Sequence, residues 1–304
     1  MIDSIRTAPA AAEPVPMILD TDTFNEIDDQ FALIYSLLSP EKIELRGVAA
    51  APFLNERSSS PEDGMRKSHA EIRRILQLMN RTGVPVQYGS ARFLPDRRTP
   101  VDSEAARFLI EESHRAAASG KRLHVGAIAA ITNVASALLL DPTLAQRLTV
   151  VWLGGHDYTY PSTLEFNLRQ DVAAAQVVFS SGVELVHIPC RDVASSLVTT
   201  SVELASNLAG CGGAGDYLQA IFDDYLLTHH CAEKVIWDIA VPSYFTLPEA
   251  TEWRTLPAPA IGDDRGWTLP GQGHPVRAAR RLDARPIFGD FFRRLRAFNL
   301  TGGR

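Results

Sequence analysis

Short apolar runs alternate with amphipathic segments along most of the chain, and this alternation predicts strands that are followed by helices. Compact apolar runs are typical of buried strands, whereas apolar residues three and four positions apart are typical of helices. Strands are expected at 17–19, 43–50, 84–87, 123–128, 148–153 and 183–188. Helices are expected at 31–38, 65–79, 103–118, 133–140, 171–180 and 288–298, and residues 202–248 have an almost wholly helical pattern. The alternation predicts an α/β fold with a mainly parallel open sheet and helices on both faces.

Composition narrows the class of protein further. With 304 residues, of which 45% are hydrophobic, the chain can form one large domain, expected over 16–304 after a disordered tail at 1–15. A net charge of −6 argues against a nucleic-acid partner, and no apolar run approaches the length of a membrane span. The three cysteines are scattered without a C-x-x-C pair, so neither a zinc site nor a disulfide framework is indicated and a cytoplasmic protein is expected. The negative net charge favours a small ligand as the partner.

The stretch from Met17 to Phe31 carries the densest candidate chemistry. Four carboxylates, Asp20, Asp22, Asp28 and Asp29, lie between a predicted strand and a predicted helix. Carboxylates crowded in this way repel each other, and a divalent cation is the usual means of neutralising them. The alternative is that one acid caps the helix while the others are solvated. Capping explains one acid out of four, so a metal site is the preferred hypothesis.

These acids also carry a resemblance to a known family. Asp20-Thr21-Asp22 followed by Asp28-Asp29-Gln-Phe-Ala-Leu resembles the amino-terminal signature of the inosine-uridine-preferring nucleoside hydrolase superfamily, Asp-x-Asp-Pro-Gly-x-Asp-Asp. Here Asp28 follows Asp22 by six positions instead of four, and Thr-Phe-Asn-Glu-Ile replaces the Pro-Gly turn. The resemblance implies a Rossmann-like nucleoside hydrolase fold. It also implies hydrolysis of ribonucleosides to ribose and free base, by a homodimer or homotetramer.

The resemblance further implies a calcium site. Asp22, Asp29 and Asp238 match the carboxylate ligands, and the segment Ile128-Ala-Ala-Ile-Thr-Asn matches the one that supplies a backbone carbonyl, here that of Ile128. Oxygen-only ligation favours a hard cation, and calcium tolerates irregular geometry. Asp22 would also take a proton from the attacking water as general base. Without the resemblance, the Ile128 segment would be an ordinary strand-to-helix turn.

Ribose contacts are implied for Asp28, Asn55, Glu165 and Asn167. In Glu165-Phe166-Asn167, an extended backbone would point the Glu and Asn side chains to the same side, which suits two adjacent hydroxyls. Taken alone, each of these residues also fits a surface loop or a turn.

The base would be handled by residues near the last carboxylate. Many relatives have His immediately before that carboxylate, where this chain has Trp237, whose indole can stack on a purine. Trp237 therefore indicates a purine preference, with burial in a helical layer as the alternative. Tyr225 and His229 match residues that line the base pocket, and His229 is a candidate for protonating the base, although tandem histidines are commonly on the surface.

Two other functions compete with nucleoside hydrolysis. A strand followed by Asp-x-Asp also resembles the nucleophile motif of haloacid-dehalogenase-type phosphatases, which wants Thr or Val where Phe24 stands. A nucleoside or ribose sensor that retains the calcium site but has lost turnover is the non-enzymatic alternative. Phosphatase activity would favour the first of these, and tight binding without base release the second.

Overall fold

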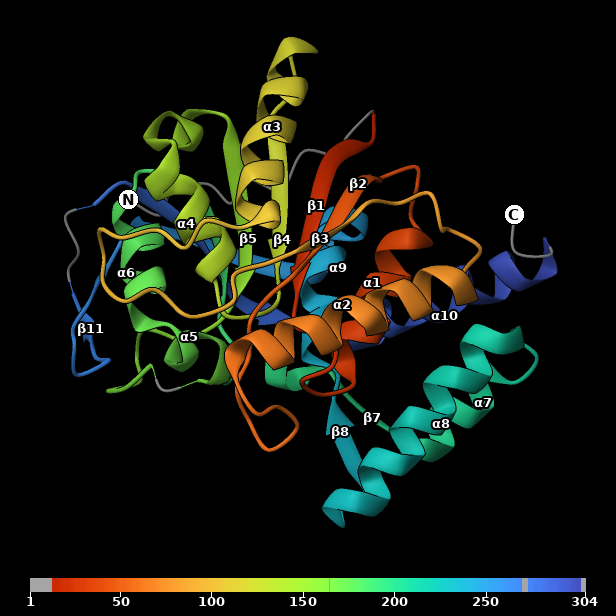
Figure 1. Cartoon of the computed structure of the whole chain (residues 1–304). Coiled ribbons are helices and arrows are strands. Elements are labelled where there is room, and N and C mark those ends of the chain that lie inside the picture. The colour runs from red at the N-terminus through yellow and green to blue at the C-terminus, as the bar shows by residue number, and fades with distance from the viewer. Residues whose placement is uncertain (1–12, 164, 270–272, 302–304) are drawn as a thin grey trace.

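A mostly parallel eight-stranded sheet forms the centre of the protein, whose computed structural model describes residues 13–163, 165–269 and 273–301 (Figure 1). The strand order is β3-β2-β1-β4-β5-β6-β12-β9, and β9 alone of these strands runs antiparallel to its neighbour. The strands are β1 (Val15–Thr21), β2 (Ile43–Ala50), β3 (Val86–Tyr88), β4 (Leu123–Ala127), β5 (Leu148–Leu153), β6 (Glu184–Ile188), β9 (Thr251–Pro257) and β12 (Pro275–Leu282). The predicted α/β fold with a mainly parallel open sheet is confirmed.

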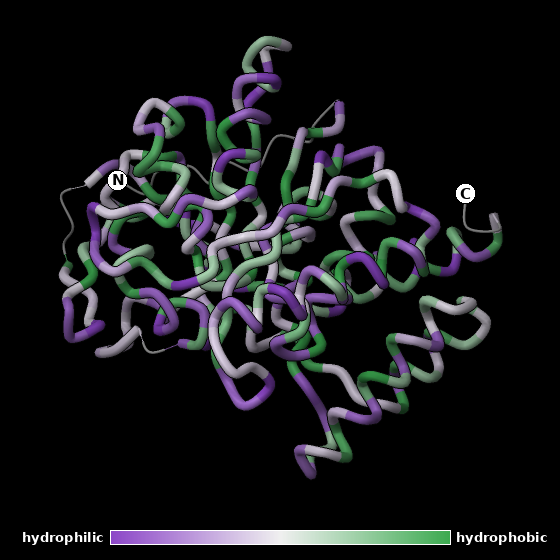
Figure 2. The backbone as a smooth tube through the Cα atoms, in the orientation of Figure 1, coloured by the Kyte–Doolittle hydropathy of each residue, from purple (hydrophilic) through white to green (hydrophobic). Residues whose placement is uncertain are grey.

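Helices cover both faces of this sheet. One hydrophobic cluster contains apolar residues of α1 (Asp28–Leu37), α2 (Pro61–Leu78), α9 (Ala240–Thr246) and α10 (Ala284–Leu300). The other contains residues of α3 (Glu104–Ala118), α4 (Thr132–Leu140) and α6 (Val172–Ser180). Hydrophobic residues accordingly concentrate along the central strands in Figure 2. A buried sheet with two covered faces follows from the near-continuous apolar strands.

The carboxyl-terminal third departs from the sequence prediction. The segment 202–248 contains α7 (Ser201–Leu208) and α8 (Gly212–His229), but the chain then forms a short strand, β8 (Glu233–Val235). This strand pairs antiparallel with β7 (Val198–Thr200), so the expectation of an almost wholly helical segment is wrong there. The physical reason is local, because His230 adopts a left-handed conformation with φ of 52° and ends α8.

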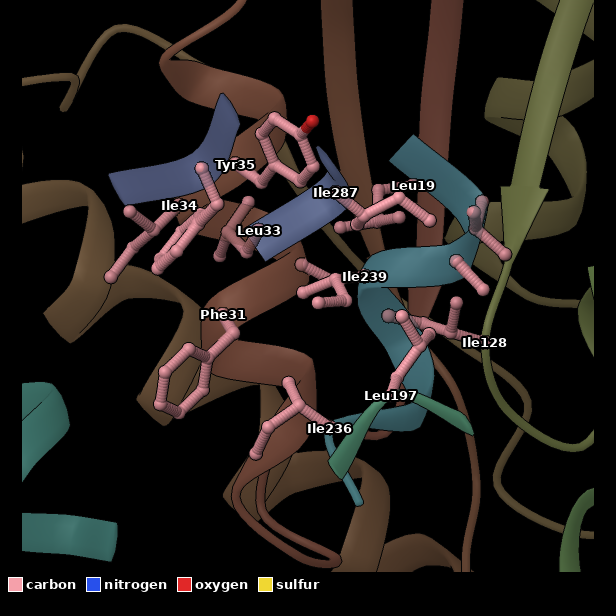
Figure 3. Close-up of a cluster of buried hydrophobic side chains, with 14 of the residues drawn as sticks. Leu19, Phe31, Leu33, Ile34, Tyr35, Ile128, Leu197, Ile236, Ile239 and Ile287 are labelled. Carbon is pink, nitrogen blue, oxygen red and sulfur yellow. The ribbon is translucent and has the colours of Figure 1, made fainter. Parts of the chain in front are cut away.

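After the antiparallel pairing of β8 with β7, the chain returns to the centre of the molecule. A 3-10 helix, Trp237–Ile239, follows β8 and packs against α1. Ile236 and Ile239 lie in the same apolar cluster as Phe31 and Leu33 of α1 (Figure 3). These apolar anchors fix the position of Asp238 between them, next to the start of α1.

The structure describes only the last part of the predicted amino-terminal tail. Residues 1–12 of the expected tail lie outside the described residues, and Val15 already belongs to β1. Across the described part of the chain, no helix has the length and apolar character needed to cross a membrane.

Candidate active site

A cavity of about 340 Å³ lies at the carboxyl ends of the central strands. Ligands bind in this position in open α/β sheets. The cavity is lined by Asp22, Asn25, Glu26, Asp28, Asp29, Ile128, Leu153, His156, Glu165, Phe166, Asn167, Arg169, Cys190, Arg191, Trp237 and Asp238. Residues from the first loop, from the ends of β4 and β5, and from the segment after β8 therefore meet at one place.

Three buried carboxylates from two distant segments form the acidic centre of the cavity. One oxygen each from Asp28, Asp29 and Asp238 lies within 4.8 Å of the others. Asp28 and Asp29 occupy the first turn of α1, where the positive end of the helix dipole favours negative charge. Asp238 reaches them on the 3-10 helix that the apolar anchors hold in place.

Asp22 differs from these acids because its carboxylate has no hydrogen-bond partner among the described residues. Both of its oxygens are buried without a hydrogen bond to any of the described residues. Asp29 accepts a hydrogen bond from the Thr21 hydroxyl, and Asp28 accepts one from the backbone N–H of Trp237 at 3.2 Å. A buried carboxylate without a partner is costly unless a ligand satisfies it.

Burial and mutual repulsion perturb the whole cluster. Burial is the largest cause of a raised pKa in each acid, bringing the pKa of Asp29 to about 7 and that of Asp28 to about 6. The pKa values of Asp22 and Asp238 are raised well above the usual range by burial and by the neighbouring carboxylates. The protein therefore supplies too little positive charge to stabilise the four carboxylates in their ionised form, and perturbation of this kind is typical of functional sites.

A divalent cation fits the donors that the chain presents. The donors are oxygens only, they are buried, and the Asp22 oxygens have no hydrogen-bond partner in the part of the chain that the structure describes. Hard cations such as Ca²⁺ and Mg²⁺ prefer such ligands. Among the described residues, the group of three carboxylates within 4.8 Å of one another contains Asp28 and does not contain the predicted ligand Asp22. Asp22, Asp29, Asp238 and Ile128, the four predicted ligands, nevertheless all line the same cavity.

Glu165 lies at the cavity with a geometry that differs from the sequence prediction. The expected extended backbone over Glu165-Phe166-Asn167 is wrong, because α5 (Phe166–Gln170) begins directly after Glu165. The Glu165 carboxylate caps this helix by accepting backbone N–H groups of Asn167 at 2.9 Å and Leu168 at 3.1 Å, and it also accepts that of Gly155 at 2.7 Å. These hydrogen bonds satisfy N–H groups that would otherwise lack partners, and they hold the Glu165 side chain at the cavity wall.

Three other predicted residues also line the cavity. Asn167 donates its amide to the carbonyl of Leu153 at 3.0 Å, which fixes its orientation. Ile128 directly follows β4, and its N–H donates to the carbonyl of Asp20 at 2.9 Å. Trp237 is only partly buried, so it is available to a ligand in the cavity, unlike a Trp sealed in a helical layer.

The remaining predicted residues lie outside the cavity walls. Asn55 donates its side-chain amide to the Asn25 side-chain oxygen at 2.6 Å, so it contacts a lining residue. Tyr225 and His229 have ring centroids 4.2 Å apart and line a second cavity of about 390 Å³ between α8 and the first loop. The structure therefore does not bring His229 to the carboxylates.

Sequence reasoning missed three residues near the acids. Asn25 and Glu26 belong to the lengthened loop and line the cavity. Lys234, on β8, is buried and donates to the Glu26 carboxylate at 2.6 Å. The lengthened loop between Asp22 and Asp28 was a sequence feature that could have pointed to Asn25 and Glu26, whereas nothing near Lys234 in the sequence indicates its acidic partners.

Comparisons with known proteins define the class to which this fold and site belong. The family model described as inosine-uridine preferring nucleoside hydrolase matches residues 17–283. The chain therefore belongs to this family, and it is a hydrolase that acts on N-glycosyl bonds. Family membership favours the hydrolase over the phosphatase and sensor alternatives.

The proteins to which this chain is similar, by sequence or by fold, are named for different substrates. The pyrimidine-specific ribonucleoside hydrolase RihA of Escherichia coli O9:H4 (strain HS) is 25% identical over 244 residues, which cover 72% of this chain and 74% of RihA. The purine-preferring ribonucleoside hydrolase from Gardnerella vaginalis superposes with a TM-score of 0.73 at 20% identity, covering 93% of this chain and 99% of that structure. The plant nucleoside hydrolase PpNRh1 gives the same values.

Proposed function

We propose that this protein hydrolyses ribonucleosides to ribose and free base with a calcium ion held by Asp22, Asp29, Asp238 and the Ile128 carbonyl. The observation that carries the proposal is the Asp22 carboxylate, buried at the cavity with neither oxygen partnered by a described residue. Oxygen-only ligands favour a hard cation, and a predicted ligand, Asp22, outside the tight group of Asp28, Asp29 and Asp238 suits calcium better than magnesium, which demands near-ideal octahedral geometry.

Asp22 is the general base of the proposed reaction. Its oxygens, which no described residue hydrogen-bonds, can accept a proton from a water molecule that attacks C1′ of the ribose. A bound cation supplies Lewis acidity, which lowers the pKa of water and orients the ribose hydroxyls. The other carboxylates of the cluster stabilise positive charge that develops on the sugar as the bond to the base breaks.

Asp28, Glu165 and Asn167 orient the ribose. Glu165 and Asn167 are fixed by backbone hydrogen bonds, so their remaining acceptor capacity is presented in a defined direction. Asn55 acts through Asn25, whose side chain it holds at the cavity. Pre-organised polar groups of this kind place a substrate without an entropic cost at the moment of reaction.

Trp237 contacts the base and favours purines. Its ring lies at the cavity that also contains the carboxylates, and stacking on an aromatic face grows with the area of the base. Since His229 lines the other cavity, solvent protonates the departing base in this scheme. The relatives include pyrimidine-specific and purine-preferring enzymes, so the preference depends on this chain's own residues.

Base release from inosine, adenosine, guanosine, uridine and cytidine tests the proposal. We expect release that requires added Ca²⁺, stops in excess chelator, returns when Ca²⁺ is restored and is faster for purines. Trp237→Phe keeps an aromatic ring and serves as the matched control for Trp237→Ala. Equal rates in chelator and in Ca²⁺ would exclude the calcium mechanism, and a faster reaction with uridine would exclude the purine preference.

A homodimer or homotetramer in the cytoplasm completes the proposal. The described cysteines are all free, which is consistent with a reducing compartment. Light scattering of the purified protein measures the oligomeric state directly.

A further inference from the structure

Lys234 is a buried cation placed against the acidic site. Its side chain is 3% exposed, and its ammonium group donates to Glu26 Oε2 at 2.6 Å and lies 3.5 Å from Asp28 Oδ1. The ammonium group also lies 4.8 Å from the ring centroid of Tyr225. A buried ammonium group is costly unless acids and hydrogen bonds compensate it, so this position is strongly constrained.

The backbone around Lys234 is held by strand pairing. Lys234 is the central residue of β8 and pairs with Thr199 of β7. The ammonium group donates a further hydrogen bond to the carbonyl of Val235 at 3.2 Å. Across the described ranges, the other lysines are at least partly exposed, so a cation held in this way is a particular feature of the site.

Glu26 brings an additional acid to the cavity on the lengthened first loop. The loop is held by the Phe24 N–H, which donates to the Ser68 hydroxyl at 3.2 Å, and by the Arg57 guanidinium, 4.4 Å from the Phe24 ring centroid. The Glu26 side chain is 42% exposed, whereas that of Asp28 is 5% exposed. Lys234 therefore links a loop acid to an acid of the buried cluster.

Asp28 is held from two directions by the same short segment. The Trp237 N–H donates to Asp28 Oδ2 at 3.2 Å, while Lys234 faces Oδ1. Two partners on two oxygens fix the rotation of the carboxylate, which a single partner would leave free. Residues 234–237 thus determine where Asp28 points.

We propose that Lys234 is a positioning residue that orients Asp28 toward the ribose and whose positive charge weakens cation binding at the neighbouring carboxylates. The proposal rests on the function proposed above. Without Lys234, Asp28 and Glu26 would be uncompensated anions beside the metal ligands. A structural lysine would stabilise the fold alone, whereas this one changes cation affinity and substrate affinity in opposite directions.

Lys234→Met tests both effects, because Met preserves much of the length and removes the charge. We expect metal-stripped Lys234→Met to bind Ca²⁺ about ten-fold or more tightly than wild type in titration calorimetry, from the loss of one positive charge near the site. At saturating Ca²⁺, the KM for a nucleoside should rise about ten-fold with a smaller change in kcat, because Asp28 is no longer oriented. Lys234→Arg should restore most of both properties.

Three further variants complete the experiment. Lys121→Met removes a lysine that pairs with Glu13 at 3.2 Å. Lys121 precedes the amino end of β4, whereas the cavity lies at the carboxyl ends of the strands, so this variant should change neither the Ca²⁺ affinity nor the KM. Glu26→Gln keeps Lys234 and removes its partner, so it should weaken Ca²⁺ binding about ten-fold. Lys234→Gln removes the charge but keeps a hydrogen-bond donor for Glu26, and it carries the test of Ca²⁺ affinity if Lys234→Met fails to fold.

The outcomes separate this inference from the proposed function. Wild-type or weaker Ca²⁺ affinity in folded Lys234→Met, or in Lys234→Gln, would overturn the role of Lys234 whatever the turnover. Failure of the wild type to release any base, with the predicted calorimetric shifts present, would overturn the proposed substrate and leave the electrostatic role of Lys234 standing.

Discussion

Replacing Asp20 with Asn is expected to stabilise the metal-free protein at neutral pH. Asp20 lies near the end of β1 and is fully buried. Asn133 donates to one carboxylate oxygen at 2.8 Å, and the other oxygen has no hydrogen-bond partner among the described residues. Burial raises the pKa of Asp20 from 3.8 to about 7, which the hydrogen bond from Asn133 only partly offsets.

The sign of the effect follows from proton linkage. The pKa of Asp20 is higher in the folded protein than in the unfolded chain, so the folded protein retains a proton that the unfolded chain has released. Stability from this group is therefore present at low pH and is lost as the pH rises toward 7. From pH 5 to the folded pKa near 7 is about two pH units, and at about 1.36 kcal/mol per unit the loss reaches about 2.7 kcal/mol by pH 8, where the folded group has also ionised.

Urea denaturation in chelator, at pH 5 and pH 8, measures this difference. Asn can still accept the hydrogen bond from Asn133, but it cannot ionise. Relative to wild type, Asp20→Asn should gain about 2.7 kcal/mol in unfolding free energy on going from pH 5 to pH 8. The change between the two pH values cancels packing effects that do not titrate. A constant difference between the two proteins across this range would refute the reasoning.

Three further predictions concern single side chains. Tyr35→Phe should lose about 1–3 kcal/mol of stability in urea denaturation, because Asp290 and Thr246 lose the buried hydroxyl that they contact at 2.7 and 2.8 Å; unchanged stability would contradict this. Trp237→Ala should raise the KM for inosine up to about ten-fold more than that for uridine, and equal changes would argue against stacking. His229→Ala should keep kcat within about two-fold, and a hundred-fold loss would assign it the leaving-group proton.

The pattern of the strands was sufficient to predict the sheet. β2 and β5 begin and end where predicted, and β5 is buried along its whole length, as expected of a central parallel strand that is apolar on both faces. The three-residue strand β8 could not be predicted, since its pairing with β7 depends on residues more than thirty positions away. Local pattern does not encode such pairing.

The candidate site was predictable where a motif is local. The four acids between the start of the motif at Asp20 and its end at Asp29 are recognisable by their close spacing, and three of them line the cavity. Lys234 was not predictable, because its burial makes sense only beside Glu26 and Asp28, about 200 residues earlier in the chain. The cap formed by Glu165 was missed for a related reason, since an extended backbone and a helix start suit Glu-Phe-Asn equally well.

The central claim is that Asp22 activates water at a metal centre in a nucleoside hydrolase. The most direct test compares kcat/KM for inosine, at saturating Ca²⁺, between wild type, Asp22→Ala and Asp96→Ala, which removes an exposed carboxylate that accepts turn N–H groups. Asp22→Ala should lose at least about a thousand-fold, and Asp96→Ala should match wild type. Activity of folded Asp22→Ala within ten-fold of wild type would contradict the account.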